Sequence, residues 1–372
     1  MSLRILQLNS ARAFGGGERH LVELCRELTA RGHALHLAHR PQAALLPYLT
    51  TPTELHPLPL RNAFDISSAR RLARLLREHK IDLLHAHLAR DYPLAALATQ
   101  LYPPTRLIIT RHVMFPLSRW HKFTLRRAAR VIAVSAAVAR QLQTQHLVTP
   151  DKIRIIPNGI DLARFGQARA TVRRGAFCAR WQINPAHLLI GALGDLNPRK
   201  GPDDFLRAAA AVAAQRDDVA FLLAGPDTSG NGADLARLKH LAQKLGLTEK
   251  VRFLGWRDDT VNFYGALALF VSASHTEAFG LTIVEAMAAG LPVVATRTAG
   301  AEEIISEGKN GRLAPVGNPL ALAEIINEML AQTETRERLG AQARLDAHAS
   351  FGLMGMTLAT EAVYYEAIKQ IN

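Results

Sequence analysis

Two glutamates eight positions apart are well placed for chemistry on a charged ligand. Glu277 and Glu285 begin and end the segment EAFGLTIVE, which follows an apolar stretch. A helix beginning at Phe279 would place Glu277 just before its first turn and Glu285 two turns further on. The amides of Phe279, Gly280 and Leu281 would then face an anion, because a helix N-terminus favours negative charge. This arrangement suits a nucleoside diphosphate sugar, and the alternative is a capped amphipathic helix with two exposed glutamates.

Two further segments have residues suited to phosphate. Arg199 and Lys200 follow the first apolar strand of the second half, in the sequence NPRKG. Adjacent cations at a strand end suit a diphosphate, although a solvated loop would look the same. Gly15, Gly16 and Gly17 lie between the first apolar strand and the first helical pattern, where glycine lets the backbone approach an anion at a helix N-terminus. A plain tight turn is the alternative.

Histidines end two of the apolar stretches. His85 and His87 close the segment DLLHAH, and His112 closes LIITRH. A neutral imidazole at a strand end could hydrogen-bond a hydroxyl or a phosphate, and a purely structural role is the alternative, favoured for His85. A zinc site would need a third ligand at suitable spacing and carboxylates, which the sequence does not show. Asp-x-Asp is also absent, so we expect no metal.

The positive charge is confined to one half of the chain. The net charge is +13, and residues 1–170 hold 25 Lys and Arg against 10 Asp and Glu. Nucleic acid, an anionic membrane, a phosphorylated substrate or a merely solvated basic face would explain this. Within 115–130, a basic amphipathic helix would suit anionic lipid, and a domain helix with core aromatics is the alternative. Its candidate membrane or acceptor contacts are Arg119, Trp120, Lys122, Phe123, Arg126 and Arg127.

Short apolar stretches alternate with helical patterns along the whole chain, which predicts parallel sheets with helices on both faces. The alternation pauses between Asp161 and Pro185, which we interpret as a linker region. The predicted strands are 4–8, 34–38, 81–85, 106–110 and 131–135, then 188–193, 219–224, 251–254, 267–272 and 292–296. The predicted helices include 18–31, 66–79, 318–331, 333–347 and 351–370.

No apolar run approaches the roughly 18–20 residues that span a bilayer, and the first residues lack the pattern of a signal peptide. Cys25 and Cys178 are the only cysteines, too few for a disulfide framework, and Cys25 falls on the apolar stripe of a predicted helix. We therefore expect a protein of the reducing cytoplasm, associated peripherally with the inner face of the plasma membrane.

Taken together in order and spacing, these motifs resemble glycosyltransferase family four, the retaining glycosyltransferases group 1. The set also includes IPNGID at 156–161 and GWRDD at 255–259. The resemblance covers essentially the whole chain and is looser in the first 110 residues. It implies the GT-B fold, with two Rossmann-like, doubly wound domains facing a central cleft. The implied domains are 1–165, completed by a last helix over about 352–372 that crosses back, and 166–351, which binds the nucleotide sugar.

The resemblance also implies roles for single residues. Glu285 would hold the ribose and Glu277 would lie beside the donor sugar, with Lys200 and Arg199 on the diphosphate. The remaining donor contacts would come from Gly16 or Gly17, Trp256, Arg257, Phe279, Gly280 and Leu281, with His112 near the transferred sugar. Many members have an arginine where this sequence has Asp195, so neutralisation of the diphosphate would rest more on Arg199.

The resulting expectation is a metal-independent, retaining hexosyltransferase without a cofactor, whose co-substrate is a UDP-sugar rather than a GDP-sugar. The basic half favours a glycan or glycolipid acceptor, with lipopolysaccharide or another cell-surface glycan as the first choice. Two alternatives remain. One is a GT-B-fold sugar-nucleotide epimerase, and the other is a basic nucleic-acid-binding protein, which would need basic and aromatic residues interleaved on strands. We expect no nucleic-acid partner.

Overall fold

The computed structural model describes residues 2–369, and the chain divides into two compact units. The first unit contains the residues up to Gly159 together with those from Leu353 onward, and the second is Ile160–Gly352. The sequence places the boundary at 165–166 instead, inside a short helix that ends at Gly166 and packs against the second unit's helix Leu281–Ala288.

The first unit is built on a seven-stranded parallel sheet of order β3-β2-β1-β4-β5-β6-β7. Its strands are β1 (Arg4–Asn9), β2 (Ala34–His39), β3 (Glu54–Pro57), β4 (Leu83–Ala86), β5 (Arg106–Arg111), β6 (Arg130–Ala133) and β7 (Ile153–Ile155). Its helices are α1 (Gly16–Ala30), α2 (Ile66–Glu78), α3 (Tyr92–Leu101), α4 (His121–Leu125), α5 (Ala136–Thr144) and α16 (Leu353–Lys369). The order reverses between β1 and β4, which makes this the switch point of the sheet.

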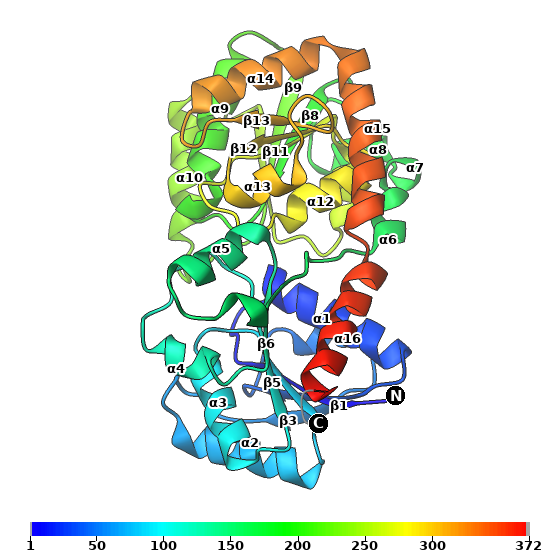
Figure 1. Ribbon diagram of the computed structural model, residues 1–372. Coiled ribbons are helices and arrows are strands. Elements are labelled where there is room, and N and C mark those ends of the chain that lie inside the picture. Colours follow the sequence, from blue (N-terminus) through cyan, green and yellow to red (C-terminus); the bar gives the residue numbers. More distant parts are fainter. Residues whose placement is uncertain (1, 370–372) are drawn as a thin grey trace. The chain divides into compact units, whose positions relative to one another are not determined.

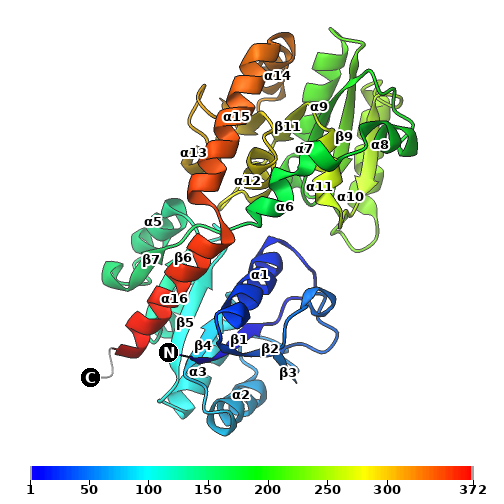
Figure 2. The same ribbon diagram turned by 90° about the vertical axis from the view of Figure 1, so that its right-hand side faces the viewer.

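The last helix belongs to the first unit although it lies at the far end of the sequence. α16 packs beside α1, as both ribbon views show (Figures 1 and 2). Buried Tyr364 of α16 joins the core formed by α1 and the central strands. Glu361 pairs with Arg31 at 2.6 Å and contacts His33 at 2.8 Å, so a charged anchor supplements the apolar contact. The predicted return of the C-terminal helix is therefore correct.

The second unit repeats the architecture with a six-stranded parallel sheet of order β10-β9-β8-β11-β12-β13. Its strands are β8 (Leu188–Leu193), β9 (Val219–Ala224), β10 (Val251–Gly255), β11 (Leu269–Ser272), β12 (Val293–Thr296) and β13 (Arg312–Ala314). Its main helices are α9 (Pro202–Ala213), α10 (Ala233–Lys244), α11 (Thr260–Ala266), α12 (Leu281–Ala288), α13 (Ala299–Ile304), α14 (Pro319–Ala331) and α15 (Thr333–Ser350). The switch point lies between β8 and β11.

Two sequence interpretations are wrong. The supposed linker at 161–185 contains three short helices, α6 (Leu162–Gly166), α7 (Ala168–Thr171) and α8 (Arg174–Arg180), of which α7 packs against α11. Phe165 and Phe177 are buried there, so a few well-spaced apolar residues suffice to pack short helices. The segment 115–130 is not one amphipathic helix, because only His121–Leu125 is helical.

Three short strands, β3, β7 and β13, were not predicted, since each is only three or four residues long and lies at or next to an edge of its sheet. Both cysteines are free and buried, which confirms the interpretation of Cys25 as a small core residue. Within residues 2–369, no helix is both long enough and apolar enough to span a membrane.

Candidate functional site

In the second unit, the loops after the two switch-point strands bring two opposite charges together. Lys200 follows β8 and Glu277 follows β11, and ligands of doubly wound sheets bind beyond such strand ends. The Lys200 ammonium donates to both carboxylate oxygens of Glu277, at 2.7 and 2.8 Å. Glu277 is buried while Lys200 keeps partial exposure, so the lysine is the member of the pair that a ligand can reach.

Glycine is required where these two loops meet. Gly201 has φ +62°, and a Cβ on it would lie 1.9 Å from the carbonyl oxygen of Ala273. The backbone after β8 therefore touches the backbone after β11. His275 strengthens the contact, because its amide donates to the Arg199 carbonyl at 2.8 Å and its ring contacts Asp204 at 2.7 Å. This close packing sets the distance between Lys200 and Glu277.

The predicted anion-binding helix is α12, and it starts two residues later than expected. Gly280 is its N-cap, with φ +115° and no side-chain hydrogen bond to the first turn. The first-turn amides of a helix have no partner within the helix and carry its partial positive charge. Phe279, just before the helix, is buried and packs edge-on against Phe351 at 5.6 Å. The segment 279–281 is thus held rigidly with its amides at the helix start.

Glu285 is buried within α12, only 3% exposed, which excludes the alternative of two exposed glutamates. The Tyr264 hydroxyl donates to its Oε2 at 2.8 Å. A buried carboxylate needs hydrogen-bond donors, and a ligand diol would supply more of them.

The remaining donor-site candidates of the second unit lie at the same carboxyl-terminal side of the sheet. Trp256 and Arg257 follow β10, the edge strand, and Trp256 is 39% exposed. The Trp256 indole donates to Asp258 at 2.9 Å, and the Arg257 guanidinium stacks over Trp181 at 5.7 Å. Arg199 is exposed beside Lys200. An exposed aromatic plane and neighbouring cations suit a nucleotide base and phosphates.

In the first unit, the glycine loop begins α1 as expected. Gly15 is the N-cap, and the carboxylate of Glu18 accepts from the Gly15 amide at 3.1 Å and from the Asn9 side chain at 3.2 Å. A Cβ on Gly17 would lie 3.9 Å from the ring of His112. The loop and His112 are therefore neighbours at the switch-point edge of this sheet.

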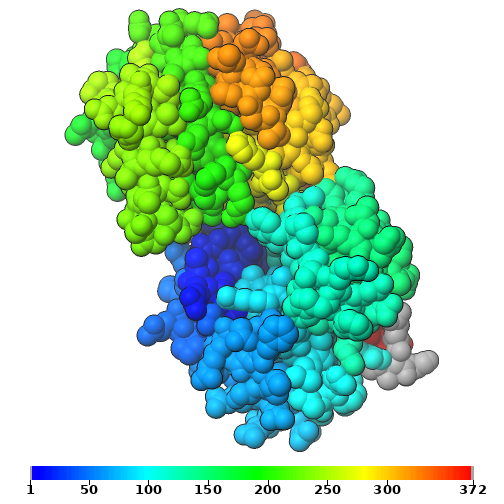
Figure 3. Space-filling view, turned by 90° about the vertical axis from the view of Figure 1, so that its left-hand side faces the viewer, coloured from blue at the N-terminus to red at the C-terminus, as the bar shows by residue number. Residues whose placement is uncertain are grey.

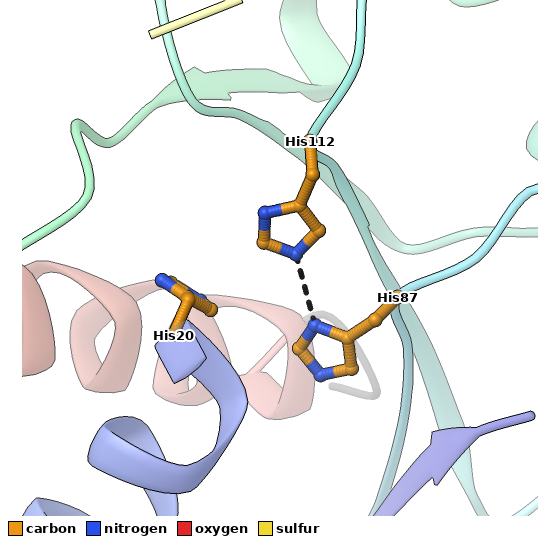
Figure 4. A group of neighbouring side chains, drawn as sticks. All are labelled: His20, His87 and His112. Atoms are coloured by element: carbon orange, nitrogen blue, oxygen red, sulfur yellow. Dashed lines mark hydrogen bonds between the residues drawn. The ribbon is translucent and has the colours of Figure 1, made fainter. Parts of the chain in front are cut away.

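His112 belongs to a group of three imidazoles, one of which, His20, was not predicted from the sequence (Figure 4). His112 Nε2 lies 3.2 Å from His87 Nδ1, and His20 of α1 packs edge-on to His112 at 4.8 Å between ring centres. Burial lowers the pKa of His20 to about 4 and lowers those of His87 and His112 well below their usual value. All three are therefore neutral near pH 7, as expected for His112.

The expectation that His87 and His112 lack a third potential metal ligand is wrong. One ligand nitrogen from each of His20, His87 and His112 lies within 4.8 Å of the others. Among the described residues, Nδ1 of His20 and Nδ1 of His112 are buried without a hydrogen-bond partner. In the sequence, only the position of His20 about one helical turn after Gly17 could have indicated that His20 is the third potential ligand. His85, by contrast, bonds Tyr364 and Thr110 through its two ring nitrogens, at 2.7 Å each, and is structural.

Arginines line a pocket of about 440 Å³ at the same edge of the first sheet. Arg12, Arg40 and Arg61 follow β1, β2 and β3, and no carboxylate lines the pocket. Within residues 2–369, the buried Nη1 of Arg40 has no hydrogen-bond partner. Burial and the nearby charges of Arg12 and Arg90 lower the pKa of Arg40. Asp91 lies near Arg40 and Asp65 near Arg61, outside the pocket lining, and the arginine side chains that line the pocket suit a phosphate or a carboxylate.

The segment with the predicted membrane contacts divides into core and surface. Leu117 and Leu125 are buried, whereas Phe123 is 72% and Trp120 37% exposed. Phe64, 74% exposed just before α2, stacks on Trp120 at 5.5 Å between ring centres and was not singled out in the sequence. Arg119, Arg126 and Arg127 are exposed and Lys122 is partly exposed. The segments with α2, α3 and α4 form one continuous face of this unit (Figure 3).

Comparison with known families matches both units. The model of Glycosyl transferases group 1 matches residues 177–346, and that of Glycosyltransferase Family 4 matches residues 14–164. Together the two models span most of the chain.

Known proteins show the same similarity. A D-inositol 3-phosphate glycosyltransferase of Streptomyces scabiei is 32% identical over 66% of this chain and 55% of its own length. The chain thus spans about half the length of such curated relatives. N-acetyl-alpha-D-glucosaminyl L-malate synthase of Bacillus anthracis is 24% identical over 94% of this chain and 93% of its own.

Solved structures share the fold. A glycosyltransferase of Rickettsia africae superimposes with a TM-score of 0.89 at 25% identity, covering 99% of both chains. HepE of Anabaena, solved with UDP-glucose, gives 0.84 at 23% identity, covering 97% of this chain and 99% of its own. Both sheets of this chain thus have the architecture of GT-B glycosyltransferases.

Proposed function

The chain belongs to the glycosyl transferases group 1, and from this premise we propose that it transfers a hexose from a nucleoside diphosphate sugar to an anionic acceptor, with retention of anomeric configuration. The observation that carries the proposal is the arrangement in the second unit. Lys200, the start of α12 and buried Glu285 come from the segments that follow the neighbouring strands β8 and β11. This edge offers cations, the N-terminal amides of α12 and a buried carboxylate, which are the groups that a nucleoside diphosphate needs.

Each donor group has a partner in this arrangement. The diphosphate would lie on the first-turn amides of α12 beside Lys200 and Arg199, and the ribose would bond Glu285. The base would lie along Trp256 and Arg257, with the sugar next to Glu277. Lys200 is already paired with Glu277. A bound diphosphate would therefore share the ammonium with this carboxylate, and binding would not leave a buried charge without a partner.

In the proposed reaction, an acceptor hydroxyl oxygen bonds to the anomeric carbon as the bond to the phosphate oxygen breaks. The departing phosphate oxygen takes the hydroxyl proton on the same face, so the configuration is retained. Lys200, Arg199 and the amides of 279–281 would stabilise the negative charge that grows on the diphosphate, which is the main contribution such a site can make. Neutral His112, next to Gly17 in the first unit, has the character of a hydrogen-bond partner for a sugar hydroxyl.

The arginine pocket supports an anionic acceptor. Arg12, Arg40 and Arg61 line it and no carboxylate is among its lining residues, and the names of two relatives include the anions inositol 3-phosphate and malate. We propose that a phosphate or carboxylate of a glycan or glycolipid acceptor binds there. Lipopolysaccharide stays the first acceptor to test among cell-surface glycans.

The exposed aromatic residues support a peripheral contact with anionic lipid. Phe64, Trp120 and Phe123 are exposed next to Arg119 and Arg126, which is the composition of an interfacial membrane contact. We propose that this face holds the protein at the inner surface of the plasma membrane, close to lipid-linked acceptors.

The test begins with thermal unfolding in the presence of UDP-, GDP- and ADP-sugars, since a ligand raises the apparent stability by RT ln(1 + [L]/Kd). UDP-glucose is the first donor because HepE was solved with it.

NMR of the product from the best donor and a phosphorylated acceptor should show the donor's anomeric configuration, with undiminished turnover in EDTA. Inverted product would disprove retention, and loss of activity that Mg²⁺ or Mn²⁺ restores would disprove metal independence. Conversion of the donor to its epimer without acceptor would favour the epimerase.

A further inference from the structure

A second group of histidines lies at the outer edge of the first unit's sheet. His36 is on β2, Glu54 and His56 are on the edge strand β3, and His79 directly follows α2. The parallel register places His36 opposite Glu54, and residues two apart on a strand point to the same face. His79 meets this face from the end of α2, which lies below the two strands in Figure 2. Four potential ligands thus come from three elements.

One ligand atom from each of His36, Glu54 and His56 lies within 4.8 Å of the others, as around one small cation, and His79 lies next to Glu54. His36 Nδ1 lies 3.1 Å from His56 Nε2 and 3.3 Å from Glu54 Oε2. Glu54 Oε1 lies 3.9 Å from His56 Nε2 and 3.6 Å from His79 Nδ1. In a tetrahedral zinc site with bonds of about 2.0–2.2 Å, neighbouring ligand atoms are about 3.3–3.6 Å apart.

The surroundings of these side chains favour the binding of a cation. His36 and His56 are buried, and a neutral imidazole offers a ring lone pair to a cation. Glu54, with 54% of its side chain exposed, brings a negative charge and leaves an approach from solvent. Arg4 is the opposing charge near His36, and it is already paired with Asp82 at 3.5 Å.

We propose that His36, Glu54 and His56 form the core of a zinc site, which His79 completes as fourth ligand by a small rotation of its ring, and that the ion ties strand β3 and the end of α2 to strand β2. Three imidazoles and a carboxylate are borderline ligands of the kind that zinc prefers, and four protein ligands make a closed, structural site. β3 has only four residues and a single neighbouring strand, so a bond to β2 and α2 would secure this edge of the sheet. The site is separate from His20, His87 and His112 and takes no part in the proposed transfer.

Zinc and cobalt binding to the full chain test the proposal. Protein stripped with EDTA and dialysed should take up one equivalent of Zn²⁺ in competition with a chromophoric chelator. Co²⁺ in the same site should give the visible absorption of tetrahedral nitrogen and oxygen coordination. Zn²⁺ at 100 times its Kd should raise the Tm of the first unit by about 5–10 °C.

Substitutions test which side chains bind the ion. Glu54→Gln and His79→Gln, whose side chains are partly exposed, should fold normally and weaken Zn²⁺ binding at least about tenfold, since even loss of an outer-shell partner costs about 10- to 100-fold. The double variant His36→Gln/His56→Gln should abolish the cobalt spectrum. His240→Gln, an exposed histidine of α10, is the matched control and should bind like the wild type.

Two results would overturn the proposal. One is the absence of stoichiometric binding by the wild type. The other is binding that persists in Glu54→Gln and His79→Gln but is lost in His20→Gln, which would place the ion at the other histidine group. Transferase activity is not a readout here, so either outcome leaves the proposed function to its own test.

Discussion

At the scale of single residues, the second unit separates two tasks that a donor site must perform. Glu285 is buried and oriented by Tyr264, so its contact with a ligand would be the same before and during reaction. Lys200 lies at the surface beside Glu277, where charge on a diphosphate would grow as the sugar departs. The first contact should therefore govern affinity and the second should govern rate.

Substitution of the two residues should show this division. Glu285→Ala should raise the donor KM at least about tenfold, the equivalent of about 1.4 kcal/mol, with a smaller change in kcat. Lys200→Ala should mainly lower kcat, by about 100-fold or more, because it removes stabilisation specific to the transition state. Steady-state kinetics at varied donor concentration tests both expectations. Arg297→Ala, which changes an exposed residue after β12, is the control. An unchanged KM in Glu285→Ala would contradict the ribose assignment.

Burial of neutral histidines makes the first unit sensitive to acid. The folded-state pKa of His20 is lowered from about 6.5 to about 4, so the unfolded chain binds the proton more readily. The stability that this group contributes is present above pH 6.5 and is lost as the pH falls towards 4, at most about 3 kcal/mol. Urea unfolding at pH 7.5, 6 and 5 should show a falling midpoint. His20→Gln should flatten the dependence, and an equal slope in this variant would refute the cause.

At the scale of elements, the contact between the loops after β8 and β11 determines the donor site. Both Gly201 and Gly246 have positive φ, of +62° and +70°, but only at Gly201 would a Cβ collide with another backbone. Gly246 is open to solvent and so provides a matched control for the cost of the left-handed conformation, about 1–2 kcal/mol.

Gly201→Ala should therefore be more destabilising than Gly246→Ala and should also weaken UDP-sugar binding. The added methyl group must push apart the loops that hold Lys200 and Glu277, whereas alanine at 246 leaves them untouched. Chemical denaturation gives the two stabilities, and calorimetric titration gives the affinities. Equal donor affinity in the two variants would show that this loop contact does not determine the site.

At the scale of the whole molecule, charge is divided between the halves of the chain, with 20 Lys and Arg against 22 Asp and Glu after residue 170. The excess of positive charge in the first 170 residues accompanies the exposed aromatic residues Phe64, Trp120 and Phe123. An attraction of this kind to anionic lipid is screened by salt, because the Debye length falls from about 10 Å at 0.1 M to about 3 Å at 1 M.

The protein should consequently sediment with anionic vesicles at 0.1 M salt and much less at 1 M, and not with neutral vesicles. Replacing Arg119, Lys122, Arg126 and Arg127 with Gln should release it, and Trp120→Ala/Phe123→Ala should weaken binding at both salt concentrations. The matched control is Arg237→Gln in α10 of the second unit. Wild-type protein that remains in the supernatant with anionic vesicles at low salt would disprove the contact, and the arginine pocket would then serve a soluble acceptor.

The sequence alone determined the features that depend on neighbouring residues. The alternation of apolar strands with amphipathic helices predicted both parallel sheets, because each element buries one face and its period follows from its geometry. The donor segment was equally readable, since Glu277, Gly280 and Glu285 lie within nine residues whose helical spacing places them. Where local signals were weak, as at 161–185 and in the edge strands, packing against distant residues decided the structure.

Only the tertiary structure decided which distant residues meet. Lys200 and Glu277 pair because β8 and β11 are neighbours at the switch point, and His20 joins His87 and His112 because α1 begins beside the ends of β4 and β5. Likewise, the arginine pocket and the proposed zinc site draw on separate elements. The strand order, which a one-dimensional pattern does not contain, brings the ends of parallel strands to one edge and so assembles these sites.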